Sequence, residues 1–399
     1  MIKNLLIITS NYPSQAFPTN GIFVQEIVNA FVNNKINTTI IRPIKIHNLI
    51  ARKIDSYYKS FEKDNIGSLQ VISPKYFSFS NKKIMGMNSA KLSQMSFNCS
   101  VRKAIKKLSQ KPDAIYSHFL YPSGATASKI SKELGILAFV GVGESINVQE
   151  ELLWSIKPFG LEKAKGDLGN LSGFIVNSSM LERKILNLFP NFGHKMIKLP
   201  NGVNLEKFRK FDKKFCRQEL KLPFDKFILI FVGAFNHRKG VLRVQQAIQN
   251  LSNNQIGIVY LGNGGLQPEG DNILFKGEVD HDHLPVWLSA ADVFVLPTLG
   301  EGSSNAILEA MACGLPILTS KGEFNDDIVD ETNSIRIDPT NIEEIRKSIL
   351  LLLENVDLRK KLSEGSLDKI HNFSLDVRAK KIITWMESVI ISDNKYVSK

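Results

Sequence analysis

The chain has 399 residues, too many for one ordinary hydrophobic core, so two or three domains are expected. Hydrophobic residues make up 43% and charged residues 23%, as in a globular protein. No stretch of the sequence approaches the ~20 apolar residues of a membrane span. The cysteines, Cys99, Cys216 and Cys313, are too few and too scattered for a disulfide framework or a zinc site. We therefore expect a cytoplasmic protein in a reducing compartment.

The net charge of +12 is unevenly distributed along the chain. Residues 1–200 carry 26 Lys and Arg against 12 Asp and Glu, whereas the remainder carries 25 against 27. A basic half favours a nucleic acid, an anionic lipid surface or an acidic substrate, and solvated charge on helix faces is the alternative. No nucleic-acid motif accompanies the basic runs, so no nucleic-acid partner is expected.

One basic segment suggests where an anionic membrane surface would bind. In VRKAIKKLSQ, residues 101–110, a helix would place Val101, Ile105 and Leu108 on one side and four cations around the rest. Further pairs occur at Arg52-Lys53 and Lys82-Lys83. These features predict a peripheral location on the inner face of the membrane. The alternative is that the three apolar residues pack into the core of the first domain.

Apolar, β-branched runs alternate with amphipathic stretches, a pattern typical of parallel α/β units. In the first half, strands are expected at residues 5–9, 37–42, 69–73, 114–117, 137–142 and 173–177, and the segment from about 45 to 110 is poorly periodic. In the second half, strands are expected at 227–233, 256–261, 273–276, 293–297, 316–319 and 334–337.

Two further segments organise these halves. The connector LPNGVNLEKF, residues 199–208, contains Pro and Asn-Gly and predicts a hinge, and residues 373–392 predict an amphipathic helix with Ser374 as its N-cap. Two doubly wound halves would bind a ligand at the carboxyl ends of their strands.

Two glutamates eight residues apart, Glu301 and Glu309, lie in EGSSNAILEAMA, directly after a predicted strand. A helix over 305–312 would place Glu301 before its N-terminus and Glu309 within it. The backbone N–H groups of Ser303, Ser304 and Asn305 would then point at an anion such as a phosphate, while the carboxylates would accept hydrogen bonds from sugar hydroxyls. The alternative is that Glu301 caps the helix and Glu309 lies on a solvated face.

A second candidate is GAFNHRKG, residues 233–240, in which Arg238 and Lys239 follow a strand end at Gly233. Arginine supplies a planar fork and lysine a compact charge, which suits the two phosphates of a diphosphate. A solvated cation pair in a loop is the alternative.

The first half offers weaker candidates after its strands. Gly21, between a strand and a helix, would let the backbone approach a ligand closely, but no full G-x-G-x-x-G pattern is present. His118 lies at a strand end, where a lone histidine is usually structural. Gly141-Val142-Gly143-Glu144-Ser145 is another small-residue loop.

Two motifs imitate known sites. Asp280-His281-Asp282 has the D-x-D pattern of metal sites, but Pro285 follows in the first turn of a predicted helix, so helix capping is the expected role. Gly262-Asn263-Gly264-Gly265 resembles a phosphate loop but lacks the Lys-Ser/Thr ending.

Taken in order, these segments resemble family 4 of the retaining glycosyltransferases, which have the GT-B fold. The resemblance covers essentially the whole chain and is densest from 196 to 340. The segments that carry it are LPNGVNLEKF, GAFNHRKG, YLGNGG and EGSSNAILEAMACGLPILTS, the last with the spacing of the family's E-x7-E motif.

The resemblance implies an α/β architecture of two Rossmann-like, doubly wound domains facing each other across a cleft. The first, acceptor-side domain would comprise 1–198 together with a C-terminal helix, 375–399, that crosses back onto it. The second, nucleotide-sugar-binding domain would comprise 199–374.

The resemblance also implies the roles of individual residues. Arg238 and Lys239 would bind the diphosphate, Glu309 the ribose hydroxyls and Glu301 the hydroxyls of the donor sugar. Other residues are expected near the donor, and these are Gly21, Gly233, Glu278, Val279, Ser303, Ser304, Asn305 and, lining the sugar pocket, His118.

The implied reaction cleaves an anomeric bond and leaves a charged diphosphate. Arg238, Lys239 and the helix N-terminus before Asn305 would stabilise that charge, so neither metal nor cofactor is expected. By resemblance, retention would follow from front-face attack, with the leaving phosphate accepting the proton of the acceptor.

The sequence departs from the family at one point. Where a glycine pair and a glutamate are usual, it has Lys321-Gly322-Glu323-Phe324-Asn325-Asp326-Asp327, with Asp326 as the candidate replacement. The alternatives to a transferase are a nucleotide-sugar epimerase or phosphorylase of the same fold, and a non-catalytic sugar-binding protein.

Overall fold

The computed structural model describes residues 1–14, 17, 20–46, 58–61, 67–79, 83–84, 87–144 and 153–397. The chain divides into two compact units. Unit 1 comprises Met1–Leu199 and Leu375–Lys399, and unit 2 comprises Pro200–Ser374. The boundaries between the units, at 199/200 and at 374/375, lie within one residue of the expected ones. Within the described ranges, no helix has the length and apolar character needed to cross a membrane.

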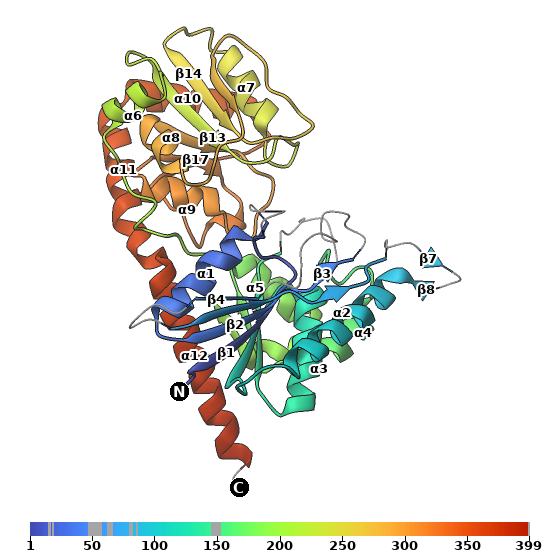
Figure 1. The fold of residues 1–399 in the computed structure, drawn as a ribbon. Coiled ribbons are helices and arrows are strands. Elements are labelled where there is room, and N and C mark those ends of the chain that lie inside the picture. Colours follow the sequence, from blue (N-terminus) through green and yellow to red (C-terminus); the bar gives the residue numbers. More distant parts are fainter. Residues whose placement is uncertain are drawn as a thin grey trace. The chain divides into compact units, whose positions relative to one another are not determined.

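Unit 1 is built on an eight-stranded sheet of order β12-β11-β10-β9-β1-β2-β5-β4 (Figure 1). All neighbouring strands pair in parallel except β4 and β5. The strands are β1 (Asn4–Ile8), β2 (Asn37–Ile41), β4 (Tyr58–Phe61), β5 (Leu69–Ile72), β9 (Ala114–His118), β10 (Ala138–Val142), β11 (Gly173–Val176) and β12 (Met196–Lys198). Short pairs form from β3 (Ile44–Lys45) with β6 (Lys75–Tyr76) and from β7 (Lys83–Ile84) with β8 (Met87–Asn88).

Helices cover both faces of this sheet because its strands are apolar on both sides. Along β1, Leu6 and Ile8 join one hydrophobic cluster, and Leu5 and Ile7 join another. Side chains alternate between the faces of a strand, so continuous apolar runs require two covering layers. The helical segments of unit 1 are α1 (Ile22–Asn33), α2 (Ser89–Ile105), η1 (Leu120–Gly124), α3 (Ala125–Leu134), α4 (Leu161–Leu168), α5 (Ser179–Leu188), η2 (Pro190–Lys195) and α12 (Leu375–Val397).

The C-terminal helix α12 belongs to unit 1 and begins directly after Ser374, as predicted. It packs with α1 on the same face of the sheet. Its Trp385 lies edge-on to Phe139, with ring centroids 5.6 Å apart, and the backbone N–H of Ile2 donates to Glu387 Oε1 at 2.7 Å. The last helix is therefore a structural part of the first unit.

Unit 2 is a second α/β unit with a six-stranded parallel sheet of order β15-β14-β13-β16-β17-β18. Its strands are β13 (Phe227–Val232), β14 (Ile256–Leu261), β15 (Ile273–Gly277), β16 (Val293–Leu296), β17 (Ile317–Ser320) and β18 (Ser334–Ile337). Its helices are α6 (Lys213–Glu219), α7 (Val241–Gln249), α8 (Leu284–Ala290), α9 (Asn305–Ala312), η3 (Glu323–Asn325), α10 (Ile342–Glu354), α11 (Val356–Ile370) and η4 (His371–Phe373).

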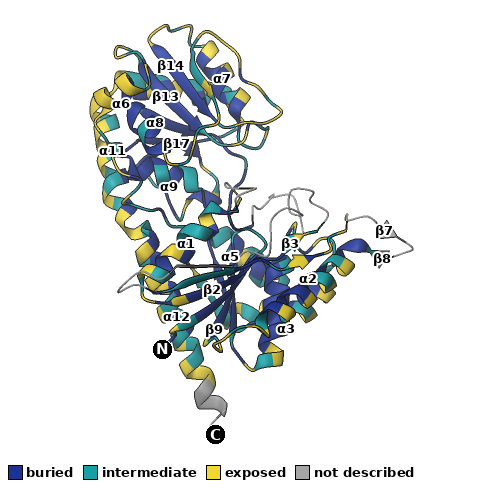
Figure 2. Cartoon of the chain, in the orientation of Figure 1, coloured by how far each residue is buried: buried dark blue, intermediate teal, exposed yellow. Residues whose placement is uncertain are grey.

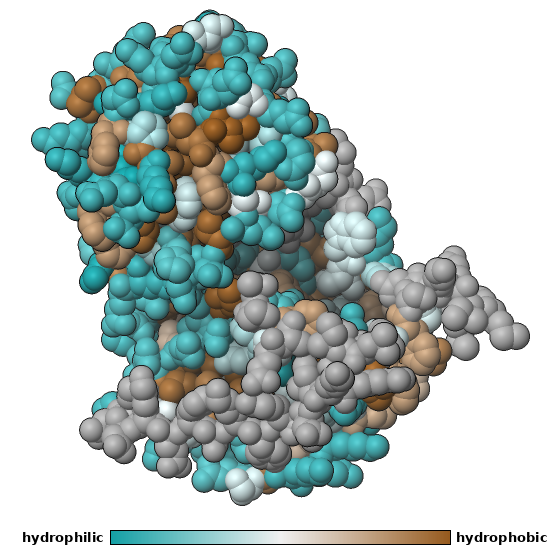
Figure 3. Space-filling model, turned by 45° about the horizontal axis from the view of Figure 1, so that its top comes forward, coloured by the Kyte–Doolittle hydropathy of each residue, from teal (hydrophilic) through white to brown (hydrophobic). Residues whose placement is uncertain are grey.

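In both units the central strands of the main sheet are buried, whereas β12 and β15 at the sheet edges are partly exposed. The exposed residues lie mainly on the outer faces of helices and in loops (Figure 2). On the face drawn in Figure 3, hydrophilic residues dominate the described surface, and hydrophobic ones are interspersed among them. All twelve expected strands are confirmed, with each end within one residue of its predicted position. The strands that were not predicted are β12 and those between residues 44 and 88 other than β5. Apart from β4, which has four residues, they have only two or three each, too few to show a period.

The prediction that residues 101–110 form an interfacial helix with an exposed apolar side is wrong. Helix α2 ends at Ile105, Val101 is fully buried, and Ile105 and Leu108 pack against the same hydrophobic cluster. An apolar stripe that would suit a membrane surface suits a protein core equally well, and here it faces the core. Of the other basic pairs, Arg52-Lys53 and Lys82 lie outside the described residues.

Candidate active site

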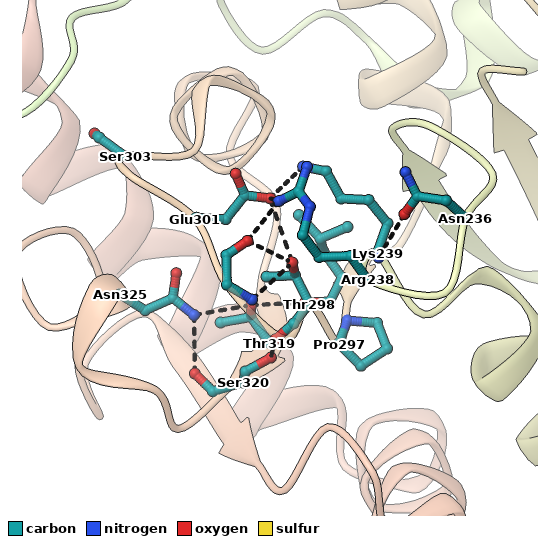
Figure 4. Close-up of polar contacts among 12 residues, drawn as sticks. Asn236, Arg238, Lys239, Pro297, Thr298, Glu301, Ser303, Thr319, Ser320 and Asn325 are labelled. Atoms are coloured by element: carbon teal, nitrogen blue, oxygen red, sulfur yellow. Dashed lines mark hydrogen bonds and ion pairs between the residues drawn. The ribbon is translucent and has the colours of Figure 1, made fainter. Parts of the chain in front are cut away.

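The carboxyl edge of the unit 2 sheet holds a compact charged cluster centred on Glu301 (Figure 4). The Glu301 side chain follows β16 and is only 9% exposed. Lys239 Nζ forms an ion pair with its Oε1, and Arg238 Nη1 lies 3.3 Å from the same oxygen. The Thr298 hydroxyl donates to that oxygen at 3.4 Å. The structure therefore brings together the first glutamate and both predicted phosphate-binding cations.

Hydrogen bonds within and between two loops hold the backbone that carries the cation pair. In the β13–α7 loop, Asn236 Oδ1 accepts from the backbone N–H of Lys239 at 3.0 Å. Across to the β16–α9 loop, Arg238 Nη1 donates to the carbonyl of Gly300 at 2.5 Å, and the Leu299 N–H donates to the carbonyl of Arg238 at 2.8 Å. These bonds determine the positions from which the side chains of Arg238 and Lys239 extend.

Glycines allow the β13 and β14 loops to pack against each other. A Cβ at Gly262 would clash with the carbonyl oxygen of Gly233, and one at Gly264 would clash with that of Phe235. The glycine-rich sequence after β14 is thus required for loop packing. A Cβ at Gly233 itself would lie 3.6 Å from the Lys239 side chain.

The N-terminus of α9 is presented without a side-chain cap. Ser304 occupies the N-cap position and makes no capping hydrogen bond, and within the described residues no group accepts from the N–H groups of Ser303, Ser304 or Asn305. Glu301 does not cap the helix, so that alternative is excluded. These free N–H groups and the helix dipole suit an anion.

Asn201, in the connector between the units' sequences, holds this helix start and was not singled out from the sequence. Its N–H donates to Ser303 Oγ at 3.0 Å, and its side-chain amide donates to the Ser303 carbonyl at 3.0 Å and to Asn305 Oδ1 at 2.8 Å. The sequence of this connector predicted only a hinge. The side chains of Ser303 and Asn305 are therefore engaged within unit 2.

Glu309 lies inside α9, with its side chain 12% exposed, so it is not on a solvated face. Its Oε1 lies 2.8 Å from Nε2 of His281, a residue considered only as the middle of the D-x-D motif.

The aspartates of that motif do not cap α8, which corrects the expectation. Helix α8 starts at Leu284, with His283 at the N-cap and no side-chain capping bond. Asp282 instead pairs with Lys207 at 2.7 Å, and this hydrogen bond lowers the pKa of its carboxyl group. The described residues contain no group of three or more His, Cys, Asp or Glu arranged to hold a metal ion.

The other predicted donor-site residues of this edge are less engaged. Glu278 is exposed, and Val279 packs against the hydrophobic cluster of unit 2. Asp326, the candidate replacement for the family's glutamate, is paired with Arg336 of β18. Its neighbour Asn325 is fully buried and donates to the Ser320 carbonyl at 2.9 Å.

The carboxyl edge of the unit 1 sheet places His118 among aromatic rings. Its imidazole lies 4.7 Å from the Phe119 ring and 5.3 Å from the Phe23 ring, between centroids. Burial, together with the nearby charge of Arg378, lowers the pKa of His118 to about 3. The Tyr116 hydroxyl lies 3.5 Å from its Nδ1. His118 is therefore a neutral imidazole at physiological pH.

Glu144, in the small-residue loop after β10, is a second buried group at this edge. Its Oε1 accepts from the Leu120 N–H at 3.1 Å and from Ser155 Oγ at 3.0 Å, while Oε2 is buried and has no partner in the described part of the chain. Burial raises the pKa of this carboxyl group. It supports the segment that follows His118.

Gly21 is required by the backbone at the start of α1. It has φ of +76°, and a Cβ there would lie 2.6 Å from the carbonyl carbon of Asn11. Its neighbours Pro18 and Thr19 lie outside the described residues. The backbone of Gly21 thus packs closely against that of Asn11 and Tyr12.

Comparisons with known proteins find similarity to glycosyltransferases. Residues 212–368, all within unit 2, match the family described as "Glycosyl transferases group 1". The putative teichuronic acid biosynthesis glycosyltransferase TuaC of Bacillus subtilis is 27% identical over 323 residues, covering 79% of this chain and 80% of that protein. An Escherichia coli protein named UDP-Gal:alpha-D-GlcNAc-diphosphoundecaprenol alpha-1,3-galactosyltransferase is 29% identical over 204 residues, covering 45% of this chain and 48% of that one.

Solved structures share the fold over nearly the whole chain. A sucrose-phosphate synthase from Thermosynechococcus elongatus matches with a TM-score of 0.75 and 19% identity, covering 98% of this chain and all of that one. Anabaena HepE, solved in complex with UDP and glucose, matches with a TM-score of 0.69 and 16% identity, covering 97% of this chain and all of that one. The two Rossmann-like units thus form a GT-B fold, and together with the sequence matches they support a glycosyltransferase.

Proposed function

We propose that the protein is a retaining hexosyltransferase that uses a nucleoside-diphosphate sugar as donor and a saccharide or lipid-linked saccharide as acceptor, in cell-surface polysaccharide synthesis. The observation that carries the proposal is the cluster in which Arg238 and Lys239 meet the buried carboxylate of Glu301. The uncapped N-terminus of α9 follows Glu301 directly in the chain. In a sugar joined to a diphosphate, the cations and free N–H groups would bind the phosphate oxygens, and the carboxylate would accept hydrogen bonds from the sugar hydroxyls.

The relatives' names support the substrate classes. One is assigned to teichuronic acid biosynthesis, another transfers galactose to a sugar on diphosphoundecaprenol, and HepE was solved with UDP and glucose. Each of these substrates belongs to that protein. For this chain they favour a UDP-type donor and an acceptor of the cell-surface class.

The proposed mechanism uses the cluster as a charge switch. With no donor bound, Glu301 pairs with both cations and offsets one of their two positive charges. When a donor binds, Arg238 and Lys239 would move to the diphosphate, and Glu301 would then accept hydrogen bonds from sugar hydroxyls. Cleavage of the anomeric bond builds negative charge on the leaving phosphate, and a preorganised donor or cation of this kind is typically worth ~3–4 kcal/mol in the transition state.

Retention is proposed to follow from front-face attack. The acceptor oxygen bonds to the anomeric carbon as the bond to the diphosphate breaks, and the released phosphate oxygen takes the acceptor's proton. His118, held neutral, would line the sugar pocket and donate or accept a hydrogen bond without adding charge. The reaction needs no metal because Arg238, Lys239 and the α9 N–H groups supply the stabilisation.

The acceptor end of the proposal includes an anionic membrane surface. Because the apolar side of 101–110 is in the core, only electrostatic attraction remains, from exposed residues such as Lys103, Lys106 and Lys107. Each cation near an anionic surface contributes ~1 kcal/mol. Binding to phosphatidylglycerol vesicles should be weak and should disappear in high salt. Vesicle binding that persists in high salt would contradict a purely electrostatic contact.

A donor screen tests the function itself. A panel of nucleoside-diphosphate sugars is measured by thermal shift, since a ligand at 100 times its Kd stabilises by ~2.7 kcal/mol. Donor turnover is then followed with and without a panel of saccharide acceptors. Acceptor-dependent turnover supports a transferase. Phosphate-dependent turnover would indicate a phosphorylase, epimer formation an epimerase, and binding without turnover a non-catalytic sugar-binding protein.

A further inference from the structure

A chain of polar contacts in unit 2 ends on Glu309. His281 Nε2 lies 2.8 Å from Glu309 Oε1, and Nδ1 of the same ring lies 2.8 Å from Lys207 Nζ. Lys207 is in turn held by Asp282 Oδ1 at 2.7 Å. The members come from three segments, which are the stretch before α6, the β15–α8 loop and α9.

Lys207 determines which nitrogen of His281 carries the proton. An ammonium group can only donate hydrogen bonds, so Nδ1 must be the acceptor and Nε2 must bear the hydrogen. Nε2–H therefore donates to Glu309 Oε1. The imidazole is also held from the side, with its centroid 5.2 Å from that of Phe208. His281 thus holds one defined oxygen of Glu309 in a fixed direction.

The other oxygen of Glu309 is open. No group of the described chain donates to Oε2, and this atom is not among the buried polar atoms that lack a partner, so it is accessible to solvent. A carboxylate with one oxygen fixed and the other open is arranged to accept a hydrogen bond from a bound molecule.

We propose that His281 is a positioning residue that fixes Glu309 so that Oε2 accepts a ribose hydroxyl of the nucleotide, an inference that rests on the proposed function. His281 does not touch the substrate and acts only through Glu309. Without it, the carboxylate gains rotational freedom, and the preference for a ribose over a sugar lacking its hydroxyls is lost. The phosphates are bound elsewhere, by the Glu301 cluster, so overall nucleotide binding should persist.

The ratio of the affinities for a ribonucleotide and for its dideoxy counterpart shows whether His281 positions Glu309 or only contributes to packing. We would measure by calorimetry the Kd of UDP, GDP and ADP and of their 2′,3′-dideoxy counterparts. The variants are His281→Phe, which keeps a ring, and His281→Gln, which can still accept from Lys207 and donate to Glu309. His283→Gln is the matched control, because His283 is exposed and two residues away. Melting temperatures show that each variant is folded.

The wild type should prefer the ribonucleotide by ~10-fold, and His281→Phe should reduce that preference ~3- to 10-fold, as expected for one hydrogen bond. Affinity for the dideoxy nucleotide should stay within ~2-fold, His281→Gln should restore most of the preference, and His283→Gln should match the wild type. Should His281→Phe fail to fold, Lys207→Met keeps the ring and should weaken the preference in the same direction. Nitrogen-15 NMR of the imidazole should then show loss of the pure Nε2–H tautomer.

The outcomes separate the proposed role of His281 from the proposed function of the protein. If the wild type binds none of the three diphosphates, the proposed function fails and the inference fails with it. If it binds one with a ribose preference that both His281→Phe and Lys207→Met retain, the inference is overturned while the function stands. Equal affinity of the wild type for ribo- and dideoxyribonucleotides would overturn it as well.

Discussion

The carboxyl edges of the two sheets differ in the polar groups that they hold. In unit 2 this edge contains paired charges, with Arg238 and Lys239 on Glu301. In unit 1 the corresponding edge holds His118, kept uncharged among aromatic rings, and Glu144, whose pKa is raised by burial. Under the proposed function, the charged cluster of unit 2 suits a diphosphate whose charge grows during reaction, whereas the neutral imidazole of His118 suits sugar hydroxyls. The same strand–loop–helix arrangement thus presents two different sets of polar groups.

Removing a charge from the unit 2 edge should give the largest effect. We expect Glu301→Gln and Lys239→Ala each to lower turnover ~10²- to 10³-fold, because each removes a group that stabilises the transition state. Steady-state kinetics with the donor found in the screen measures this. Lys360→Ala is the control, because Lys360 is an exposed lysine on α11. Near-normal turnover in both variants would mean that the cluster is only structural.

The neutral state of His118 should appear as pH-dependent stability. Its pKa is about 3 in the folded protein and ~6.5 when unfolded, so between these values the unfolded state binds an extra proton. Stability is therefore lost as the pH falls below the unfolded pKa. From pH 7.5 to 5.0 the wild type should lose ~2 kcal/mol more than His118→Gln, measured by urea unfolding. Parallel losses in the two proteins would show that His118 is protonated in the folded state.

One pair of substitutions on α2 tests which side of this helix faces the core of unit 1. Val101→Ala should cost ~1–2 kcal/mol of unfolding free energy because Val101 is fully buried, whereas Leu92→Ala should stay within ~0.5 kcal/mol. Leu92 is 42% exposed and lies on the same helix. Thermal unfolding of both variants measures the difference. Equal effects would contradict the assignment of Val101 to the core.

Chelation should have the smallest effect. If cations and N–H groups of unit 2 stabilise the leaving group, activity should be unchanged in EDTA, and Asp280→Ala should match the wild type. The assay compares turnover before and after chelation and after addition of Mg²⁺ or Mn²⁺. Loss of activity that either metal restores would make Asp280 and Asp282 candidate ligands.

The sequence by itself determined the alternation of strands and helices, because periods of two and 3.6 residues are local properties of the chain. The positions of Arg238, Lys239, Glu301 and Glu309 relative to their own strands and helices followed in the same way. Very short strands such as β12 could not be predicted, since three residues carry no measurable period.

Only the tertiary structure decided which of these residues meet. Asn201 reaches Ser303 across about a hundred residues of sequence, and His281 reaches Glu309 across 28. The parallel sheet brings the loops after separate strands to one edge, a relation that no local pattern encodes. The tertiary structure also decided that the apolar side of 101–110 faces the core. An amphipathic pattern shows which side of a helix is buried, but it does not show whether protein or lipid covers that side.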